Sequence, residues 1–581
     1  MTDQTIGYQT ARKSVARSPD SRGLASWQVS DGVALVMSAF VMLYTSIHFW
    51  RTEGTPINVF FTVTATLLIT AVLTLATRRV LFSTALTVAF VLLISATASV
   101  KRQIMNMVVH AYDIFFYLSS WSTVSFLWSD HRRLVVGFAL GVLALAMLGW
   151  LVFRCDGSRI SRRHAAAAVA LAMVGTTSGA LLKEERRHMQ FYFENLYVSS
   201  FYTSWAETAE TLWRGQLVEA APHAPGKPFA LPTGCETTTR RPHIFLIHQE
   251  SVVPPSLFPG LDYDRRVDPM FNSFDGRLHK MRVETYGGAS WLTEFSLLTG
   301  LSTHSFGGMR QFVQTVMEKR VRDTLPEALA RCGYRNVVFY PMLKNFVSNA
   351  RFYQSVGLNE IFDLKDQGAT SANERDSFYY GNALNEMERH VKSSRKPLFT
   401  YIQTMAAHWP YDITYMPEEN VAGGGESTHP EMHEYLRRVS MARIDYAYLK
   451  SELKRRFPNE PILIVHYGDH QPTATRMLLG FKQETDAEDV VAETDSPAYI
   501  SYYAVDALNW QPPALPPQEV VDVPYLGQIL LEAARLPLSE AMIERKRLLG
   551  VCDGRYYSCA DRRQVLAFHR RLIDSKLMDA R

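Results

Sequence analysis

Five long apolar stretches in the first third of the chain limit what it can fold into. They lie near residues 31–50, 57–77, 81–99, 134–153 and 164–183. An α-helix needs about 20 consecutive, mostly apolar residues to cross the hydrocarbon core of a bilayer, and each stretch approaches or reaches this length. The sequence therefore predicts a transmembrane domain over residues 31–183, built as an α-helical bundle of five spans.

A sixth stretch, residues 112–128, is aromatic and rich in serine, and it carries Asp113 near its start. With five spans, three basic clusters fall on the cytoplasmic side, as the positive-inside tendency favours. These clusters are Arg12, Lys13, Arg17 and Arg22; Arg78 and Arg79; and Arg154, Arg159, Arg162 and Arg163. A sixth span would export the last cluster, so we interpret 112–128 as an interfacial or re-entrant segment. Four other basic residues then lie outside, namely Lys101, Arg102, Arg132 and Arg133.

This topology makes residues 1–30 a cytoplasmic tail and exports everything after residue 183. No short, cleavable signal peptide is evident, so we expect the first span to stay as an anchor. Residues 184–239 are expected to form an interfacial helix and a linker, because they are first charged, then densely aromatic, then rich in proline and glycine. The aromatic helix would lie either on the outer leaflet or on the soluble domain, and the sequence does not separate these two alternatives.

Four of the five cysteines fall in the part expected to be exported, where disulfides persist; they are Cys235, Cys332, Cys552 and Cys559. Cys552 and Cys559 could close a small loop, which would leave Cys235 and Cys332 as a second pair. Unpaired thiols and other connectivities stay open. Metal binding by these cysteines is disfavoured because no C-x-x-C spacing occurs. The fifth, Cys155, lies alone in a predicted cytoplasmic loop.

In the remaining part, residues 240–581, short apolar runs alternate with helical patterns. Five runs have the character of buried strands: HIFLIH (243–248), NVVFYP (336–341), LFTYIQTM (398–405), PILIVHYG (461–468) and AYISYYAV (498–505). Strands that alternate with helices indicate an α/β domain with a mostly parallel central sheet. Ligands of such sheets bind beyond the carboxyl ends of the strands, so a site is expected at that edge.

Polar side chains follow three of these strands directly. Glu250 follows the strand at 243–248, His408 follows the strand at 398–405, and Asp469 with His470 follows the strand at 461–468. Any one of them alone would more often be a turn or capping residue. Two carboxylates and two imidazoles together favour one divalent metal ion, zinc or manganese, because these ions accept both oxygen and nitrogen ligands.

A turn followed by a helical pattern, Y-G-G-A-S-W-L-T-E-F-S-L-L-T-G, covers residues 286–300. The two glycines permit a sharp turn, and Ser290 then stands at the N-terminus of the helix, where free N–H groups favour an anion. Beside a metal ion, such a serine is a usable nucleophile. The alternative is an ordinary N-cap, but Glu294 lies four residues after Ser290 and a capping box needs three. Thr293 is a second candidate nucleophile, ranked behind Ser290.

Together these motifs resemble the sulfatase-like branch of the alkaline phosphatase superfamily. More narrowly, they are similar to its membrane phosphoglycerol and phosphoethanolamine transferases, which include lipoteichoic acid synthase. The resemblance implies an alkaline-phosphatase-like catalytic domain over residues 240–581, with a metal ion held by Glu250, Ser290, Asp469 and His470. It also implies that His408, in A-H-W-P, contacts the phosphoryl group. In the family a threonine usually stands where this chain has Ser290.

The chain departs from the family pattern at two places. The family often has F-W-N-R-D, whose Trp and Arg contact phosphate, where this chain has F-V-S-N-A-R. An ungapped match puts Asn349 at the arginine position, and Arg351 would have to reach there from two residues away. The segment Q-P-T-A-T-R after G-D-H also lacks the histidine that some relatives supply. Asn349, Arg351 and Thr293 are therefore the weaker candidates for substrate contacts.

The predicted function is the transfer of a phospholipid-derived phosphoglycerol or phosphoethanolamine group to an exported glycan or lipid acceptor. It would pass through a covalent phospho-Ser290 intermediate, with His408 protonating the departing diacylglycerol. The expected location is the bacterial cytoplasmic (inner) membrane, with several spans and the catalytic domain on the periplasmic or extracellular side. A formylglycine-type sulfatase is disfavoured because C/S-x-P-x-R does not follow at Ser290.

Two alternatives remain beside this function. One is a phosphodiester or sulfate-ester hydrolase of the same superfamily, in which water takes the place of the acceptor. The other is a non-catalytic membrane protein that binds or senses a ligand. A net charge of +4 over 581 residues gives no case for a nucleic-acid partner.

Overall fold

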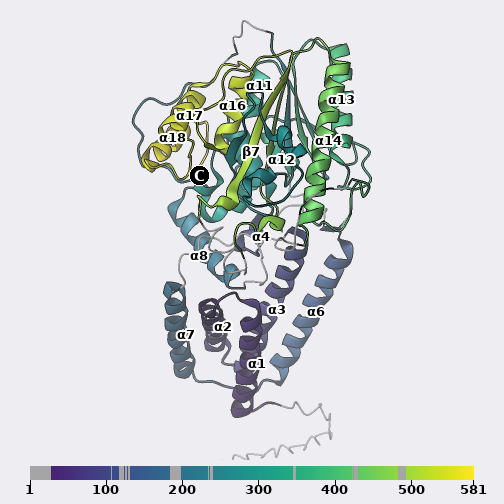
Figure 1. Cartoon of the computed structure of the whole chain (residues 1–581). Helices are drawn as coiled ribbons and strands as arrows, with labels where there is room; N and C mark the ends of the chain where they lie inside the picture. The colour runs from purple at the N-terminus through teal and green to yellow at the C-terminus, as the bar shows by residue number, and fades with distance from the viewer. Residues whose placement is uncertain are drawn as a thin grey trace, which may run out of the picture.

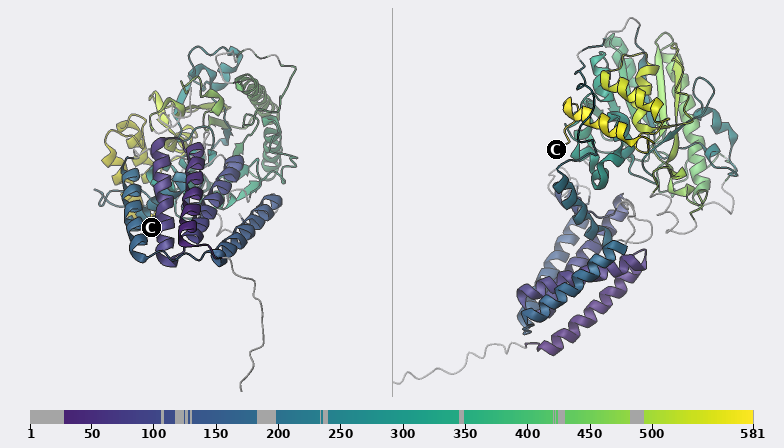
Figure 2. Two further views of the ribbon diagram at one scale, coloured as in Figure 1. Left: turned by 90° about the horizontal axis from the view of Figure 1, so that it is seen from below. Right: turned by 90° about the vertical axis from the view of Figure 1, so that its left-hand side faces the viewer.

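The chain folds into an N-terminal group of helices and a C-terminal α/β domain that lie end to end (Figure 1; two further views in Figure 2). This arrangement comes from a computed structural model. It describes residues 28–105, 108–116, 124, 127–128, 131–182, 198–232, 234–235, 240–344, 349–419, 421, 423, 430–481 and 493–580.

Five helices of the N-terminal part are long and apolar enough to cross a membrane, and they fall where the five spans were predicted. They are α1 (Asp31–Thr52), α2 (Pro56–Thr77), α3 (Val80–Met105), α6 (Arg132–Cys155) and α7 (Arg162–Leu182). Two of them, α2 and α7, pack closely because α7 presents glycines to α2. A Cβ atom at Gly179 would lie only 3.0 Å from the Cα of Phe61. Small residues at such an interface let two apolar helices approach along their backbones.

The sixth apolar stretch begins with a short helix, α4 (Ala111–Phe116). Most of the predicted interfacial or re-entrant segment, from residue 117 to 128, lies outside the described residues. The start of α4 is held by α8 (Val198–Arg214): His110 Nε2 lies 2.9 Å from Glu207 Oε2, and Ser204 Oγ accepts from the backbone N–H of Ala111 at 2.8 Å.

Helix α8 lies where the aromatic interfacial helix was predicted, and it packs on the transmembrane helices. Tyr202 is within hydrogen-bond distance of Thr66 on α2 (3.2 Å), and Ser199 Oγ donates to Glu53 just after α1 (2.7 Å). Its far end remains open to solvent or lipid, since Trp213 is 92% exposed. The helix also contacts the α/β domain at η3 (Thr303–Phe312), so it lies between the two parts of the chain.

The α/β domain is built on one sheet of eight strands in the order β4-β3-β5-β1-β6-β7-β2-β8. The strands are β1 (His243–Gln249), β2 (His279–Arg282), β3 (Arg335–Phe339), β4 (Glu360–Phe362), β5 (Leu398–Gln403), β6 (Ile462–Gly468), β7 (Ile500–Leu508) and β8 (Val520–Asp522). All five predicted strands are present. Strands β4, β3, β5, β1 and β6 run parallel, and β7 is antiparallel to both of its neighbours. The predicted mostly parallel sheet is therefore confirmed.

Helices cover both faces of this sheet (Figure 1). One apolar core forms against α9 (Ser290–Thr299), α11 (Leu325–Arg331), α12 (Asn349–Ser355), α16 (Leu526–Ala533), α17 (Glu540–Val551) and α18 (Arg562–Asp574). The other forms against α13 (Asp376–Ser393) and α14 (Met432–Arg456). Strands β1, β5 and β6 are buried along their whole length, as expected for parallel strands covered on two sides.

Two disulfides join the four cysteines expected to be exported. Cys235 pairs with Cys332, and Cys552 pairs with Cys559. The first bond ties the segment before β1 to the end of α11, and the second closes a short loop after α17. Cys155 is free and exposed at the end of α6.

We expect the two disulfides to contribute unequally to stability. The paired cysteines are 97 residues apart in one bond and 7 in the other. Because loop-closure entropy grows with the logarithm of loop length, the long loop should contribute about 2 kcal/mol more. Urea unfolding of a variant with both Cys235 and Cys332 replaced by serine, compared with the same change at Cys552 and Cys559, measures this difference. Equal losses in the two variants would contradict it.

Candidate active site

The carboxyl ends of β1 and β6 bring two acidic side chains together. The strands are parallel neighbours with Gln249 opposite Gly468, so the next residues, Glu250 and Asp469, emerge side by side. A Cβ atom at Gly468 would lie 2.0 Å from the carbonyl oxygen of Val252, so only glycine allows this approach. The backbone N–H of Ser251 donates to Asp469 Oδ1 at 2.8 Å and fixes one oxygen of that carboxylate.

His470 completes this pair of acids as predicted. Its Nε2 atom lies 3.2 Å from Glu250 Oε1 and 3.3 Å from Asp469 Oδ2. Its Nδ1 atom lies 3.0 Å from the carbonyl oxygen of Gln471, which can only accept, so Nδ1 carries a hydrogen. That bond fixes the ring with Nε2 directed at both carboxylates.

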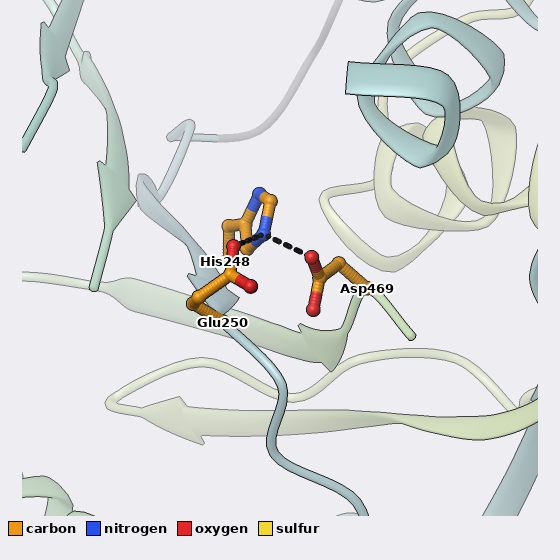
Figure 3. A group of neighbouring side chains, drawn as sticks. All are labelled: His248, Glu250 and Asp469. Carbon is orange, nitrogen blue, oxygen red and sulfur yellow. Dashed lines mark ion pairs between the residues drawn. The ribbon is translucent and has the colours of Figure 1, made fainter. Parts of the chain in front are cut away.

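A second histidine, which the sequence interpretation missed, joins the group from within β1. His248 Nε2 lies 3.1 Å from Asp469 Oδ2 and 3.5 Å from Glu250 Oε2 (Figure 3). The available signal was the period of two in a strand, which puts His248 and Glu250 on the same face. In the sequence, however, His248 is only the last residue of a predicted buried strand. The four side chains His248, Glu250, Asp469 and His470 are called the His–acid cluster below.

Ser290 enters the His–acid cluster from the N-terminus of α9. Ala289 before it has a positive φ of 59°, as has Gly287 with 72°, and this turn aims the first helical residue at β1. The backbone N–H of Gly287 donates to the carbonyl oxygen of Gln471 at 2.9 Å, which ties the turn to the loop after β6. Ser290 Oγ donates to Glu250 Oε2 at 2.8 Å, so it contacts the cluster and is not the N-cap, a position that Ala289 occupies.

Charge within the cluster is balanced by the histidines. Burial alone would lower the pKa of His470, but Asp469 and Glu250 outweigh it and raise this pKa to about 9. Burial likewise opposes a charge on His248, but Tyr467 and Asp469 outweigh it and raise its pKa well above the ordinary value. Burial alone would raise the pKa of Glu250, but the nearby imidazoles of His248 and His470 outweigh it and hold this pKa well below the usual range. Two buried carboxylates here require positive charge beside them.

The cluster fits a divalent metal ion. Ligand atoms of His248, Glu250 and Asp469 all lie within 4.8 Å of one another, and all three residues are buried. Three inward atoms, His248 Nε2, Asp469 Oδ2 and His470 Nε2, make no hydrogen bond of good geometry among the described residues. Buried polar atoms without partners are rare, and a set of two nitrogens with carboxylate oxygens is a typical ligand group for a transition metal.

The remaining predicted residues lie around the cluster. Thr293 is buried, and its Oγ1 donates to the carbonyl oxygen of Asp469 at 2.7 Å, so it fastens α9 to the loop after β6. Asn349 is buried and donates from Nδ2 to the hydroxyl of Tyr340 at 2.6 Å. Arg351 is exposed and pairs with Glu318 at 2.9 Å. Among the described residues, Asn349 and Arg351 form no hydrogen bond or ion pair with the cluster.

His408 lies on the exposed loop after β5. Arg438 on α14 holds this loop, because it donates to the carbonyl oxygens of His408 (2.7 Å) and Ile413 (2.8 Å). A positive charge on His408 would lower the pKa of Glu250. The side chain of His408 is exposed, which is compatible with a proton donor to a substrate.

Part of the α/β domain resembles a known protein family. Residues 281–526 match the family described as Sulfatase. This part of the α/β domain is therefore similar to the sulfatase family. The matched region contains Ser290, Asp469 and His470, whereas His248 in β1 and Glu250 directly after β1 precede it. The resemblance seen in the motifs is thus confirmed for the domain.

Similar proteins were found among both sequences and solved structures. An uncharacterized protein of Haemophilus influenzae is 23% identical over 356 residues, which cover 59% of this chain and 60% of that protein. The chain therefore matches less than two thirds of that relative's length. The phosphoglycerol transferase GacH of Streptococcus pyogenes, solved with sn-glycerol-1-phosphate, is 16% identical with a TM-score of 0.46, covering 59% of this chain and 87% of that one. The lipooligosaccharide phosphoethanolamine transferase A (EptA) of Neisseria meningitidis, an integral membrane protein, is 11% identical with a TM-score of 0.49, covering 88% and 96%.

A buried carboxyl group supports the loop that carries His408. Asp376 is the first residue of α13, and its Oδ1 accepts from the backbone N–H of Ala406 at 3.4 Å. Burial, together with the nearby charge of Asp445, raises the pKa of Asp376 to about 8. Ionisation of this group therefore opposes the folded state.

We expect the stability of the α/β domain to fall as the pH rises from about 4 to about 8. An Asp whose pKa is raised from about 4 in the unfolded chain to about 8 in the fold favours the folded state only while it is protonated. Asp376→Asn should remove this part of the pH dependence between about pH 4 and pH 8. Urea midpoints of the wild type and the variant at several pH values measure it, and parallel curves would argue against the raised pKa.

Proposed function

We propose that this protein transfers a substituted phosphoryl group from a membrane phospholipid to an exported acceptor through a phospho-Ser290 intermediate. One observation supports this most directly: the Ser290 hydroxyl lies 2.8 Å from Glu250 in the His–acid cluster, at the N-terminus of a helix. The α/β domain that contains this serine is similar to the sulfatase family, and it follows five helices that are able to cross a membrane.

The proposed metal ligands are Glu250, Asp469, His470 and Ser290, with His248 as an addition that the geometry supports. One divalent ion, zinc or manganese, would supply positive charge that favours ionised Ser290 and stabilises charge on the phosphoryl oxygens. Among the chain's own groups, Glu250 Oε2 accepts the hydrogen of the serine hydroxyl. The first N–H groups of α9 lie beside the oxygen that attacks, and they favour negative charge there.

The reaction then consists of two displacements at phosphorus. In the first, ionised Ser290 Oγ forms a bond to phosphorus, the bond from phosphorus to the diacylglycerol oxygen breaks, and His408 supplies a proton to that oxygen. In the second, an acceptor hydroxyl attacks the same phosphorus and loses its proton to His408, and the bond to Ser290 breaks, which returns the ionised serine. The headgroup, phosphoglycerol or phosphoethanolamine, stays on phosphorus throughout.

A phospholipid donor agrees with the position of the domain. Helix α9 continues into η3, which contacts α8 and α4 at the end of the transmembrane helices. Exported space contains no ATP, so a lipid is the available source of an activated phosphoryl ester.

We also propose a division of the chain into four parts: residues 1–30 as a cytoplasmic tail, 31–183 as the membrane domain, 184–239 as interfacial helix and linker, and 240–581 as the exported catalytic domain. The corresponding location is the bacterial inner membrane with a periplasmic or extracellular site.

Replacing Ser290 should abolish transfer without loss of the fold. We expect Ser290→Ala to reduce transfer of radiolabelled headgroup from phospholipid to background and to lose the covalent adduct that mass spectrometry would find on Ser290. Ser290→Thr is the matched control, because it keeps a hydroxyl at the helix start and should retain measurable transfer. Undiminished transfer by Ser290→Ala would refute the nucleophile assignment. Label found only in free headgroup phosphate, with every acceptor tested, would indicate a hydrolase.

Removal of the metal ion should also abolish transfer. We expect the purified protein to hold about one divalent ion per chain and to lose transfer after chelation, because two buried carboxylates and two imidazoles form one ligand group. Return of activity with Zn²⁺ or with Mn²⁺, measured beside metal content, identifies the native ion. Full activity in metal-free protein would contradict the proposed chemistry.

A further inference from the structure

A third buried carboxylate lies behind the His–acid cluster and has no part in the chemistry described so far. Glu294 lies on α9 one helical turn after Ser290 and is only 2% exposed. Residues four apart lie on the same side of a helix, so both side chains face β1. The spacing that ruled out a capping box is thus the spacing that directs Glu294 at the cluster.

Glu294 is held by hydrogen bonds from three other elements. The hydroxyls of Tyr353 on α12 and Tyr401 on β5 each donate to its Oε1 at 2.8 Å. Gln314 Nε2 reaches its Oε2 at 3.5 Å, and the hydroxyl of Tyr467 on β6 lies 2.9 Å from that of Tyr401. Within the described part of the chain, no Lys or Arg pairs with Glu294. Among the described residues, His248 is the one basic side chain within 4 Å of the Glu294 carboxylate.

His248 therefore stands between two sets of acceptors. Its Nδ1 atom lies 3.5 Å from Glu294 Oε1 and 3.3 Å from the hydroxyl of Tyr401. Its Nε2 atom lies 3.1 Å from Asp469 Oδ2. A hydrogen on Nδ1, attracted by the carboxylate behind it, leaves the Nε2 lone pair facing the cluster.

We propose that Glu294 is a positioning residue that fixes the tautomer and ring orientation of His248, and that His248 Nε2 is thereby a further metal ligand. A histidine that donates its second N–H to a carboxylate is the usual arrangement at metal sites. This proposal rests on the metal-dependent function proposed above. It goes beyond that function because it assigns a role to Glu294 and adds an imidazole to the ligand group.

The placement of Glu294 also links the nucleophile to this ligand. Ser290 and Glu294 belong to one rigid helical turn, which contacts Glu250 at one end and His248 at the other. Thr293 between them bonds to the carbonyl oxygen of Asp469. A shift of α9 would therefore change the position of the serine and the orientation of His248 together.

The test measures metal binding by the full-length protein in detergent, with Co²⁺ as a spectroscopic probe and no substrate present. The variants are Glu294→Gln, His248→Asn and the double change; asparagine keeps a polar group toward Glu294 but removes the atom that faces the acids. We expect Glu294→Gln to weaken Co²⁺ binding by about 10- to 100-fold and to change the visible absorption spectrum in the direction of His248→Asn. If Glu294 acts through His248, the double variant should bind no more weakly than His248→Asn alone.

Glu284→Gln is the matched control. Glu284 is also a buried carboxylate that contacts α9, where it accepts from Ser296 Oγ at 3.0 Å, and it accepts from the backbone N–H of Thr303 at 2.6 Å. In the described part of the chain, Glu284 forms no hydrogen bond or ion pair with the His–acid cluster. This variant should keep both the wild-type affinity for Co²⁺ and the wild-type spectrum, whatever it does to the unfolding temperature.

Several outcomes would overturn the proposal. A wild-type spectrum and affinity in Glu294→Gln, or equal changes in Glu284→Gln, would reduce Glu294 to a structural role. Unchanged binding in His248→Asn would remove His248 from the ligands. If Glu294→Gln does not fold, Tyr401→Phe, which removes one donor to the carboxylate, should still shift the spectrum, and no shift counts against the proposal. Since no step of transfer is measured, a failure of the phospholipid reaction leaves this result standing, whereas a wild type that binds no metal refutes both.

Discussion

The contact on which the site depends is the one between Glu250 and Asp469 at the ends of β1 and β6. Their register puts two carboxylates side by side in the protein interior, and Gly468 is the residue that lets the chain pass closely enough. Carboxylate oxygens of the two residues lie within 4.8 Å of each other. Like charges this close repel strongly in a medium of low polarity, so positive charge must accompany them. The histidines can carry it, and an ion can replace their protons. The sheet thus creates a local excess of negative charge that the rest of the site must balance.

The helix with the serine also connects the site to the membrane part of the chain. Helix α9 leads into η3, whose last residue, Phe312, lies with its ring 5.7 Å from that of Tyr112 and 6.0 Å from that of His110. His110 is paired in turn with Glu207 on α8. Trp291, next to Ser290, donates to the carbonyl oxygen of Gln311 at 3.1 Å. Ser290 and the end of the transmembrane helices are therefore joined by a short series of direct contacts, which suits the proposed substrate in the bilayer.

Much of this architecture could be predicted because it depends on local pattern. Apolar length alone located the five spans, and uninterrupted apolar runs located five strands of the sheet. Strands β2, β4 and β8 were not predicted, because β4 and β8 are only three residues long and β2, HKMR, mixes polar with apolar residues. His248 was missed for a related reason. Within a buried apolar run, the neighbouring residues in the sequence do not show whether a histidine is a core residue or a metal ligand. Arg351 illustrates the opposite case, since the family pattern suggested a phosphate contact but Glu318 is its partner.

The sequence by itself determined the membrane helices, the parallel core of the sheet and the identity of the side chains that emerge at its carboxyl edge, because hydrophobic length, strand pattern and turn residues act over a few neighbouring positions. The tertiary structure alone decided which of those side chains meet. The register of β1 against β6 brings Glu250 to Asp469, and the packing of α9 on the sheet brings Ser290 to one side of the cluster and Glu294 to the other. Such contacts join residues far apart in the chain, and no local pattern specifies their distances.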